Sequence, residues 1–244
     1  RTLVAPLPAR SDTMAPPNDA LPIDAVLEDI RARLQTSARL IVTAPPGAGK
    51  TTRVPLALLA DGWAQKGRIR LVAPRRIAAR AAAERLAGSL GETVGRSVGL
   101  RTRLDVRTSP TARIEVVTEG VFTRMILSDP ALEGVAGVIL DEVHDRSLDT
   151  DAGLAFALDA QAVLREDLRL ILMSATLPPG LETTAEAGIV RSEGRMWPVE
   201  TFYLGFDARR RLEEQAADAV RVALTEQPGS ILVFLPGAAE IRRV

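Results

Sequence analysis

Short apolar runs alternate with amphipathic stretches along most of the chain. Between residues 23 and 35, apolar side chains recur every three or four positions, the spacing of an amphipathic helix. Short apolar or β-branched runs bounded by Gly, Pro or polar residues predict strands instead. The predicted strands are 39–43, 67–73, 113–118, 135–140 and 168–173, with a short extended piece at 97–103; further helices are predicted at about 77–90, 119–127 and 151–164.

This alternation predicts the fold class. Strands that alternate with helices favour right-handed crossovers and a mainly parallel sheet covered on both faces, an α/β fold. In such folds ligands bind beyond the carboxyl ends of the strands. Polar motifs follow the predicted strand ends at Thr43, Ala73, Thr118, Leu140 and Met173. We therefore expect these motifs to form one site.

The pattern changes after the last of these strands. Residues 178–198 are expected to lead out of the first domain. A strand at 199–205, a helix at 209–224, a strand at 230–235 and a helix start at 238 are predicted beyond it. The strand at 230–235, the turn after it and the helix start at 238 repeat the strand–turn–helix order that begins at residue 39, but this second turn lacks the lysine present at position 50. The start of a second, similar domain is therefore predicted.

The first 22 residues have no periodicity and are rich in Pro and Ala. Proline interrupts any apolar core, so the segment does not resemble a signal peptide, and a disordered lead-in is expected over 1–22. Met14 is one candidate for the true start, in which case residues 1–13 would be upstream readthrough. No apolar run reaches about 18 residues, which predicts no membrane span and a cytoplasmic protein.

Composition limits the remaining possibilities. The formal net charge is +0, so nucleic-acid binding requires locally grouped arginines rather than a bulk positive field. With no cysteine in the chain, disulfides and thiolate metal sites are excluded. Aromatic residues make up only 3% of the sequence, which argues against a platform on which bases stack.

The most informative stretch is 44–51, Ala-Pro-Pro-Gly-Ala-Gly-Lys-Thr, between a predicted strand and a helix. Such a turn directs backbone N–H groups and a helix N-terminus at phosphate oxygens. Gly47 and Gly49 permit close approach, Lys50 reaches the β- and γ-phosphates, and the Thr51 hydroxyl ligates Mg²⁺. The alternative is a glycine turn with a solvated lysine. The predicted nucleotide-binding residues are Pro46, Gly47, Ala48, Gly49, Lys50, Thr51 and Thr52.

An acidic pair follows the apolar strand at 135–140. Asp141 is predicted to hold Mg²⁺ together with Thr51, and Glu142 to act as the general base on the attacking water. His144 is the only histidine in the chain and is expected to couple the nucleotide site to neighbouring motifs. The predicted catalytic set is therefore Lys50, Asp141, Glu142 and His144, with Mg-ATP as the cofactor.

Taken together, these motifs resemble those of superfamily 2 helicases. Residues 47–51, 141–144 and the Ser-Ala-Thr at 174–176 occur in the family's order and rough spacing. The Asp-Glu-x-His form is similar to the DEAH/RHA group. Further matches are 73–76, 101–103, 117–120 with Arg124, and 232–237 with 240–241, so that the resemblance covers about 21–244.

The resemblance implies a RecA-like helicase ATP-binding domain at 23–195 and a truncated second RecA-like domain at 196–244. It also implies ATP-driven movement along, and unwinding of, nucleic acid, with single-stranded RNA favoured over DNA as the partner. Arg75, Arg76, Thr118 and Arg124 would contact that strand, and Ser174 and Thr176 would link the γ-phosphate to domain movement. Thr118 has the alternative role of a helix N-cap, and the arginine pair that of solvated charges.

Two rival functions remain open. One is a DNA-directed translocase of the same superfamily, since no residue is identified that reads a 2′-hydroxyl. The other is a nucleic-acid-binding module that uses ATP only as a switch, against which the intact Glu142 argues. The resemblance also places an arginine finger in the part of the second domain that the sequence lacks. Such fingers contribute roughly 10³–10⁵ in rate, so the chain is expected to bind nucleotide, hydrolyse it poorly and unwind nothing.

Overall fold

The computed structural model describes residues 20–194 and 199–244, which divide into two units considered separately here. Most of the predicted lead-in lies outside the described residues. Its last residues do not: the Leu21 N–H donates to Asp24 Oδ2 over 2.8 Å, and Pro22 begins a 3-10 helix, η1. Order at these two residues differs from the predicted disorder because Leu21 packs against the core and the Pro22 carbonyl accepts a hydrogen bond from Ser192 Oγ over 2.9 Å.

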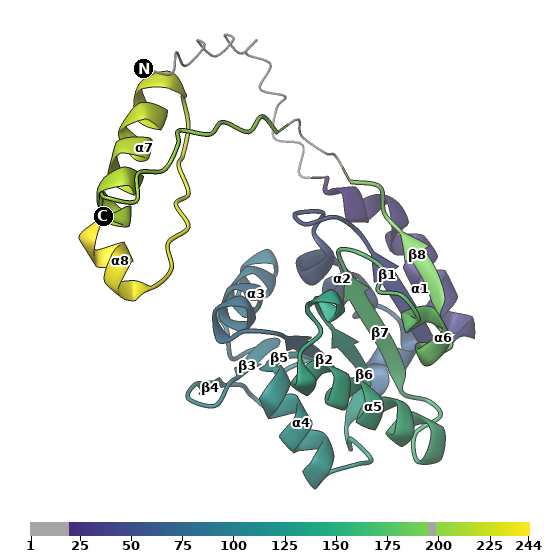
Figure 1. Cartoon of the computed structure of the whole chain (residues 1–244). Helices are drawn as coiled ribbons and strands as arrows, with labels where there is room; N and C mark the ends of the chain where they lie inside the picture. The colour runs from purple at the N-terminus through teal and green to yellow at the C-terminus, as the bar shows by residue number, and fades with distance from the viewer. Residues whose placement is uncertain (1–19, 195–198) are drawn as a thin grey trace. The chain divides into compact units, whose positions relative to one another are not determined.

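The helices and strands of the first unit alternate as predicted (Figure 1). Each predicted strand is present within one residue of its expected bounds, and the helix predicted from residue 23 begins as the 3-10 turn η1 before it becomes α-helical. In chain order the elements are η1 (Pro22–Val26), α1 (Leu27–Thr36), β1 (Arg39–Thr43), α2 (Lys50–Leu58), η2 (Gly62–Lys66), β2 (Arg68–Ala73), α3 (Arg76–Ser89), β3 (Val98–Arg101), β4 (Val106–Arg107), β5 (Ile114–Thr118), α4 (Glu119–Ser128), β6 (Val135–Leu140), η3 (Val143–Asp145), α5 (Leu148–Val163), β7 (Arg169–Ser174), α6 (Leu181–Ala185) and β8 (Gly188–Arg191).

These strands form one 8-stranded sheet in the order β4-β3-β5-β2-β6-β7-β1-β8. All neighbours are parallel except β3 and β4, which are antiparallel. The carboxyl ends of β5, β2, β6, β7 and β1 therefore lie along one edge of the sheet in that order. This arrangement confirms the predicted α/β class with a mainly parallel sheet.

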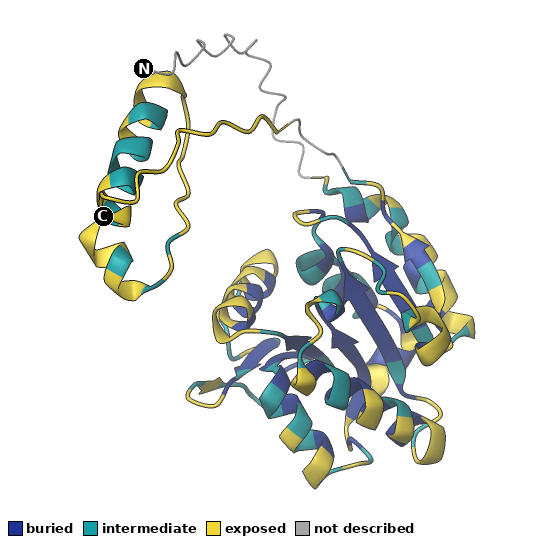
Figure 2. Ribbon diagram, viewed as in Figure 1, coloured by how far each residue is buried: buried dark blue, intermediate teal, exposed yellow. Residues whose placement is uncertain are grey.

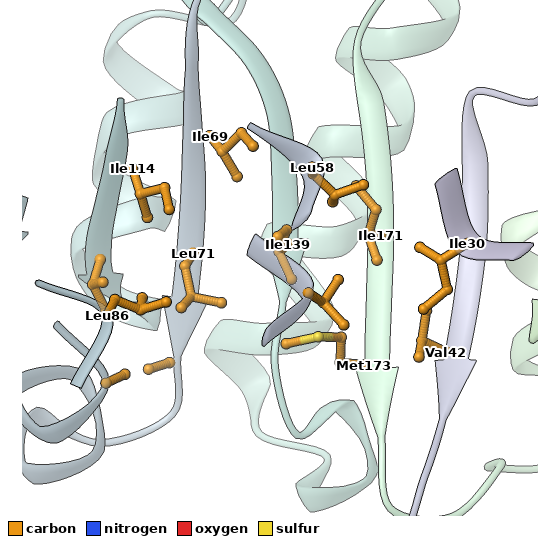
Figure 3. Close-up of a cluster of buried hydrophobic side chains, with 14 of the residues drawn as sticks. Ile30, Val42, Leu58, Ile69, Leu71, Leu86, Ile114, Ile139, Ile171 and Met173 are labelled. Carbon is orange, nitrogen blue, oxygen red and sulfur yellow. The ribbon is translucent and has the colours of Figure 1, made fainter. Parts of the chain in front are cut away.

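Helices cover the sheet on both faces, as the alternation of side chains along each strand requires. In β1, Leu40 and Val42 join a cluster that also contains residues of α1, α2 and α3, whereas Ile41 joins a second cluster with α4, α5 and α6. Figure 3 shows the first cluster, in which Ile30, Leu58 and Leu86 extend from the helices over strand residues. The strands are the most buried part of this unit (Figure 2).

The segment expected to lead out of the first domain instead completes it. Within 178–198, α6 and then β8 form, and β8 pairs with β1 as an edge strand. The pairing aligns Val42 with Val190, and Val190 is only 2% exposed. A run as short as Gly-Ile-Val-Arg carries little periodic signal, so its strand state depends on the open edge of β1 rather than on its own sequence.

The residues from 199 onward contain two helices, α7 (Leu212–Glu226) and α8 (Ala238–Arg243), close to the predicted positions. The strands predicted at 199–205 and 230–235 are wrong for the described structure, because neither segment is assigned to a strand. A strand requires a hydrogen-bonded neighbour, and neither segment pairs with any described residue. The start of a second α/β domain is thus not seen here. Among the described residues, no helix combines the length and apolarity needed to span a bilayer.

Candidate functional site

The loop between β1 and α2 has the geometry of a phosphate-binding turn. Gly47 and Gly49 adopt φ angles of 77° and 95°, a left-handed conformation that glycine adopts without a steric penalty. Gly49 also packs tightly, since a Cβ atom there would lie 2.5 Å from Leu21 Cδ1. Pro46 is exposed at the tip of the loop, and Thr52 Oγ1 donates to the Gly49 carbonyl over 3.3 Å. The loop therefore delivers the first N–H groups of α2 to its concave side.

Lys50 begins α2 and is only 4% exposed. Its Nζ donates to the Ala44 carbonyl over 2.6 Å and to the Pro45 carbonyl over 3.4 Å. The ammonium therefore lies inside the curve of the loop, where it is bonded to neutral carbonyls rather than to a carboxylate. A phosphate in the loop would offer it a stronger, charged acceptor.

Thr51 and Asp141 meet across the sheet. Thr51 Oγ1 donates to Asp141 Oδ2 over 2.7 Å, and Asp141 Oδ1 accepts the Glu142 N–H over 3.0 Å. Asp141 is 5% exposed, and burial raises the pKa of its carboxyl from 3.8 to about 6, although the Thr51 hydrogen bond opposes the shift. The pair joins the end of β6 to the phosphate loop after β1.

The turn after Asp141 is strained. Glu142 and Arg146, neither of them glycine, have φ angles of 53° and 50° and bracket the 3-10 turn η3. Oε2 of Glu142 is buried and has no hydrogen-bond partner among the described residues. Residues in sparsely populated backbone conformations persist only where the surrounding structure holds them, and they are often found at functional sites. The turn presents Glu142 as an unused acceptor beside Asp141.

His144 connects this turn to β7. Its Nδ1 accepts the Ala175 N–H over 3.4 Å and lies 3.3 Å from Glu142 Oε2. A nitrogen that accepts a hydrogen bond cannot donate through the same lone pair, so the approach to Glu142 is a close contact and not a hydrogen bond. His144 thus touches both the acidic turn and the Ser-Ala-Thr turn, the arrangement that a coupling role requires.

The Ser-Ala-Thr turn that His144 contacts spans residues 174–176. Ser174 is fully buried, and its Oγ donates to the Thr176 carbonyl. Its own carbonyl accepts the Ala44 N–H over 3.1 Å, at the start of the phosphate loop. Thr176 is exposed. The turn therefore lies between the phosphate loop and His144.

The residues present fit a divalent cation. A hydroxyl and a carboxylate, Thr51 Oγ1 and Asp141 Oδ2, converge within 2.7 Å of each other. Hard cations such as Mg²⁺ take oxygen ligands and are usually bound in proteins by one or two carboxylates together with substrate phosphates and waters. Oε2 of Glu142, the next residue, is buried with no hydrogen-bond partner among the described residues. These oxygens are of the type that a hard cation takes.

The predicted nucleic-acid residues form a separate group along the same edge. Arg75 is the N-cap of α3 and Arg76 its first residue, and both are exposed beyond β2. Thr118 is the N-cap of α4 beyond β5, but its side chain makes no capping hydrogen bond. Arg124 is exposed on α4, where its Nε donates to the Gly120 carbonyl over 3.1 Å. In the strand order these residues follow β2 and β5, on one side of β6, whereas the phosphate loop follows β1, on the other side of it.

Sequence reasoning missed one buried polar group next to this edge. Glu119 enters the sequence analysis only as part of the matched stretch 117–120, yet it is 7% exposed and accepts hydrogen bonds from Ser147 and Thr150. Its position between Thr118 and Gly120, inside a matched motif, was the available signal. The partners lie 28 and 31 residues away and were not predictable from spacing.

Comparison with known proteins agrees with this geometry. Residues 25–184 match the DEAD/DEAH box helicase family. The chain is 48% identical over 227 residues to the ATP-dependent RNA helicase HrpB of Escherichia coli (strain K12). The aligned region covers 92% of this chain and 28% of that relative's length. The chain thus spans less than a third of the relative.

Solved structures give the same result. The crystal structure of the Escherichia coli DEAH/RHA helicase HrpB superimposes with a TM-score of 0.86 and 48% identity, over 91% of this chain and 29% of the other. The crystal structure of the E. coli DExH-box NTPase HrpB gives a TM-score of 0.76 over 95% of this chain and 28% of the other. On its sequence match and on its fold, the chain belongs to the DEAD/DEAH box helicase family.

Proposed function

We propose that this chain carries the ATP-binding core of a DEAH-type helicase that couples Mg-ATP hydrolysis to movement along, and unwinding of, RNA. The observation that carries the proposal is the hydrogen bond from Thr51 Oγ1 to Asp141 Oδ2. It brings a phosphate loop and an acidic turn from two strands to the place where a Mg-nucleotide would lie. Family membership and the name of the E. coli relative support ATP and RNA as ligands.

The phosphate loop would bind the nucleotide. Backbone N–H groups over 47–52 and the positive end of α2 attract phosphate oxygens, with Pro46 at the start of the loop. Lys50 would exchange its bonds to the Ala44 and Pro45 carbonyls for charged bonds to the β- and γ-phosphates. Thr51 and Asp141 would hold Mg²⁺, which when bound neutralises charge on the phosphate oxygens.

Hydrolysis needs an oriented water. Two observations support Glu142 in this role: its buried Oε2 has no partner among the described residues, and its neighbour Asp141 accepts a hydrogen bond from Thr51 Oγ1. The carboxylate would accept the proton of the attacking water. His144 would transmit a movement of the acidic turn to Ser174 and Thr176 through its hydrogen bond with the Ala175 N–H.

The arginine pair would hold the nucleic-acid strand. Arg75 and Arg76 are exposed at the end of β2, with guanidinium groups suited to forked contacts with phosphates. Thr118 and Arg124 extend the track towards β5. Contacts of this kind recognise the backbone, so binding would be salt-sensitive with weak sequence preference.

The test is the nucleotide chemistry of the chain and of two variants. Binding of Mg-ATP is measured first, then hydrolysis with and without single-stranded RNA. Lys50→Ala should abolish binding, whereas Glu142→Gln should keep binding and lose turnover. A wild-type chain that binds neither Mg-ATP nor RNA would overturn the proposal.

The same experiment separates the two rivals. Stimulation by single-stranded DNA alone would assign the chain to the DNA-directed translocases. If RNA binding responds to ATP but Glu142→Gln changes nothing, the nucleotide acts as a switch. The unused Oε2 of Glu142 favours hydrolysis over that second outcome.

Turnover by this chain alone should be slow. In P-loop enzymes an arginine finger contributes roughly 10³–10⁵ in rate. Within the first unit, the described arginines nearest in sequence to the nucleotide residues are already engaged or exposed elsewhere: Arg53 pairs with Asp24 over 3.6 Å and Arg146 with Asp151 over 3.1 Å. Fast RNA-stimulated turnover by residues 1–244 would contradict this expectation.

A further inference from the structure

Glu119 is a buried carboxylate that the proposed function does not use. It begins α4 and is 7% exposed. Ser147 Oγ donates to its Oε2 over 2.7 Å, and Thr150 Oγ1 donates to its Oε1. Among the described residues it forms no ion pair, so the two hydroxyls and the positive end of α4 compensate its burial. A buried carboxylate is unfavourable unless its hydrogen bonds are strong, so this arrangement needs an explanation beyond packing.

The two hydroxyls fix the far end of the acidic turn. Ser147 is the N-cap of α5, where its Oγ accepts the Thr150 N–H over 3.0 Å. It follows Arg146, the second left-handed residue of the strained turn. The near end is fixed by Asp141, whose N–H donates to the Val72 carbonyl over 2.9 Å. A strained segment keeps its shape only while both ends are held, so Glu119 helps to set the position of Glu142.

The other side of Glu119 faces the predicted nucleic-acid track. Thr118, at the end of β5, directly precedes it, and Arg124 lies on the second turn of the same helix. The start of α4 also packs closely on α5: a Cβ atom at Gly120 would lie 3.3 Å from Asp149 Oδ2, and Thr123 Oγ1 lies 3.3 Å from the Asp149 carbonyl. A shift of Thr118 is therefore passed on to Ser147 rather than absorbed.

We infer that Glu119 is a positioning residue that makes the acidic turn at 141–147 respond to nucleic acid bound at Thr118. The inference rests on the proposed function, since it needs both ligands to bind. Its consequence is a coupling between the two sites: RNA changes the affinity for Mg-ATP, and Mg-ATP changes the affinity for RNA by the same factor. The carboxylate and its two hydroxyls carry that coupling without touching either ligand.

The experiment measures the coupling in this chain. The dissociation constant of a fluorescent ATP analogue with Mg²⁺ is determined with and without saturating single-stranded oligouridylate. We expect a ratio of at least about 5 in the wild type, the lower end of usual coupling factors. Glu119→Gln and Thr150→Val should bring the ratio to about 1–2, with each ligand alone bound within about twofold of wild type.

Two further variants separate positioning from packing. Thr150→Ser keeps the hydroxyl donor and should keep the coupling. Ser128→Ala removes an exposed hydroxyl at the C-terminal end of α4, where its Oγ donates to the Met125 carbonyl of the same helix, so it should also keep the coupling. Hydrogen exchange of 141–147 provides a second readout: oligouridylate should slow exchange there in the wild type and not in Glu119→Gln.

Each outcome decides the inference. Loss of the ratio in both test variants, with Thr150→Ser and Ser128→Ala unaffected, supports it. A wild type that binds both ligands without coupling, or test variants that retain the full ratio, overturns it and leaves the proposed function intact. A wild type that binds neither ligand overturns the proposed function itself. Thermal unfolding of each variant confirms that it is folded before binding is measured.

Discussion

Thr51 Oγ1 lies 2.7 Å from Asp141 Oδ2, although the two residues are 90 positions apart in the sequence. The strand order makes the contact possible, because only β7 separates β6 from β1 in the sheet. The hydroxyl and the carboxylate are the two groups predicted to share a Mg²⁺ ion. Under the proposed function, their contact marks the place of the nucleotide phosphates.

Asp141→Asn should stabilise the metal-free protein at neutral pH. Burial raises the folded-state pKa of Asp141 from 3.8 to about 6. The folded state therefore favours the protonated carboxyl over the ionised one. The contribution of Asp141 to the free energy of unfolding is fully present below about pH 4 and is lost as the pH rises through 6. The loss corresponds to about 3 kcal/mol. The asparagine variant should avoid it, so its advantage in unfolding free energy should grow between pH 4 and 7.

The measurement is urea unfolding in EDTA at several pH values. Asp29→Asn is the control, because Asp29 is half exposed in an ion pair with Arg33 and its loss should change stability by at most about 1 kcal/mol. The same Asp141 variant should lose Mg²⁺-dependent nucleotide binding. Parallel pH profiles for wild type and Asp141→Asn would show that the carboxyl is not perturbed.

Glu115→Ala should strongly destabilise the fold. Glu115 is fully buried in β5, where Arg70 Nη1 contacts its Oε2 and Arg101 Nη2 lies 3.3 Å from its Oε1. Burial, with Arg68 and Arg101 nearby, lowers the pKa of Arg70 to about 10. Removing the Glu115 carboxylate leaves the largely buried Arg70 guanidinium without an ion-pair partner among the described residues. The free energy of unfolding should fall by about 3–5 kcal/mol.

Urea unfolding at neutral pH measures that loss. Arg80→Ala is the matched control, since Arg80 and Asp105 form a more exposed ion pair at 3.1 Å that should contribute at most about 1 kcal/mol. Equal effects of the two variants would mean that the Glu115 group is not a compensated buried cluster.

Gly49→Ala and Gly47→Ala should differ in severity. Both glycines have positive φ, so alanine introduces backbone strain of about 1 kcal/mol at either position. Only at position 49 would the new methyl group collide, 2.5 Å from Leu21 Cδ1, whereas nothing lies within 4 Å at position 47. Gly49→Ala should therefore lower the melting temperature more. Thermal unfolding checks this order, and a larger loss from Gly47→Ala would contradict it.

Arg75→Ala combined with Arg76→Ala should weaken RNA binding and flatten its salt dependence. Each phosphate contact to a single strand contributes a slope of about 0.7 in log affinity against log salt, so the slope should fall by roughly 1.4 if both contacts exist. Fluorescence anisotropy with labelled oligouridylate at several salt concentrations measures it. Arg85→Ala, an exposed arginine further along α3, is the control and should leave the slope unchanged. An unchanged slope in the double variant would identify the pair as solvated charges.

Much of the first unit was predictable because its signals are local. Apolar runs such as 135–140 and 168–173 form strands within a residue of their predicted bounds, since a strand covered on both faces is apolar throughout. The phosphate loop was predictable for the same reason: glycine positions, a lysine and a hydroxyl within a few residues define its chemistry. The alternation of strands and helices then implied that the motifs share one edge.

The errors occurred where a partner decides the structure. The 188–191 segment is a strand because the edge of β1 is open to it, and 230–235 is not a strand because no described residue pairs with it. Order at Leu21 similarly depends on its packing against Gly49. Local sequence contains no information about whether such a partner is present.

By itself, then, the sequence determined the chemical groups and the strand ends that carry them: Lys50, Thr51, Asp141 and Glu142, in that order. Only the tertiary structure decided which of these groups meet. The order of strands in the sheet brings Thr51 to Asp141, and the packing of α4 on α5 brings Glu119 to Ser147 and Thr150. The physical reason is that hydrogen bonds and packing act over a few ångströms in space, whatever the number of residues between the partners.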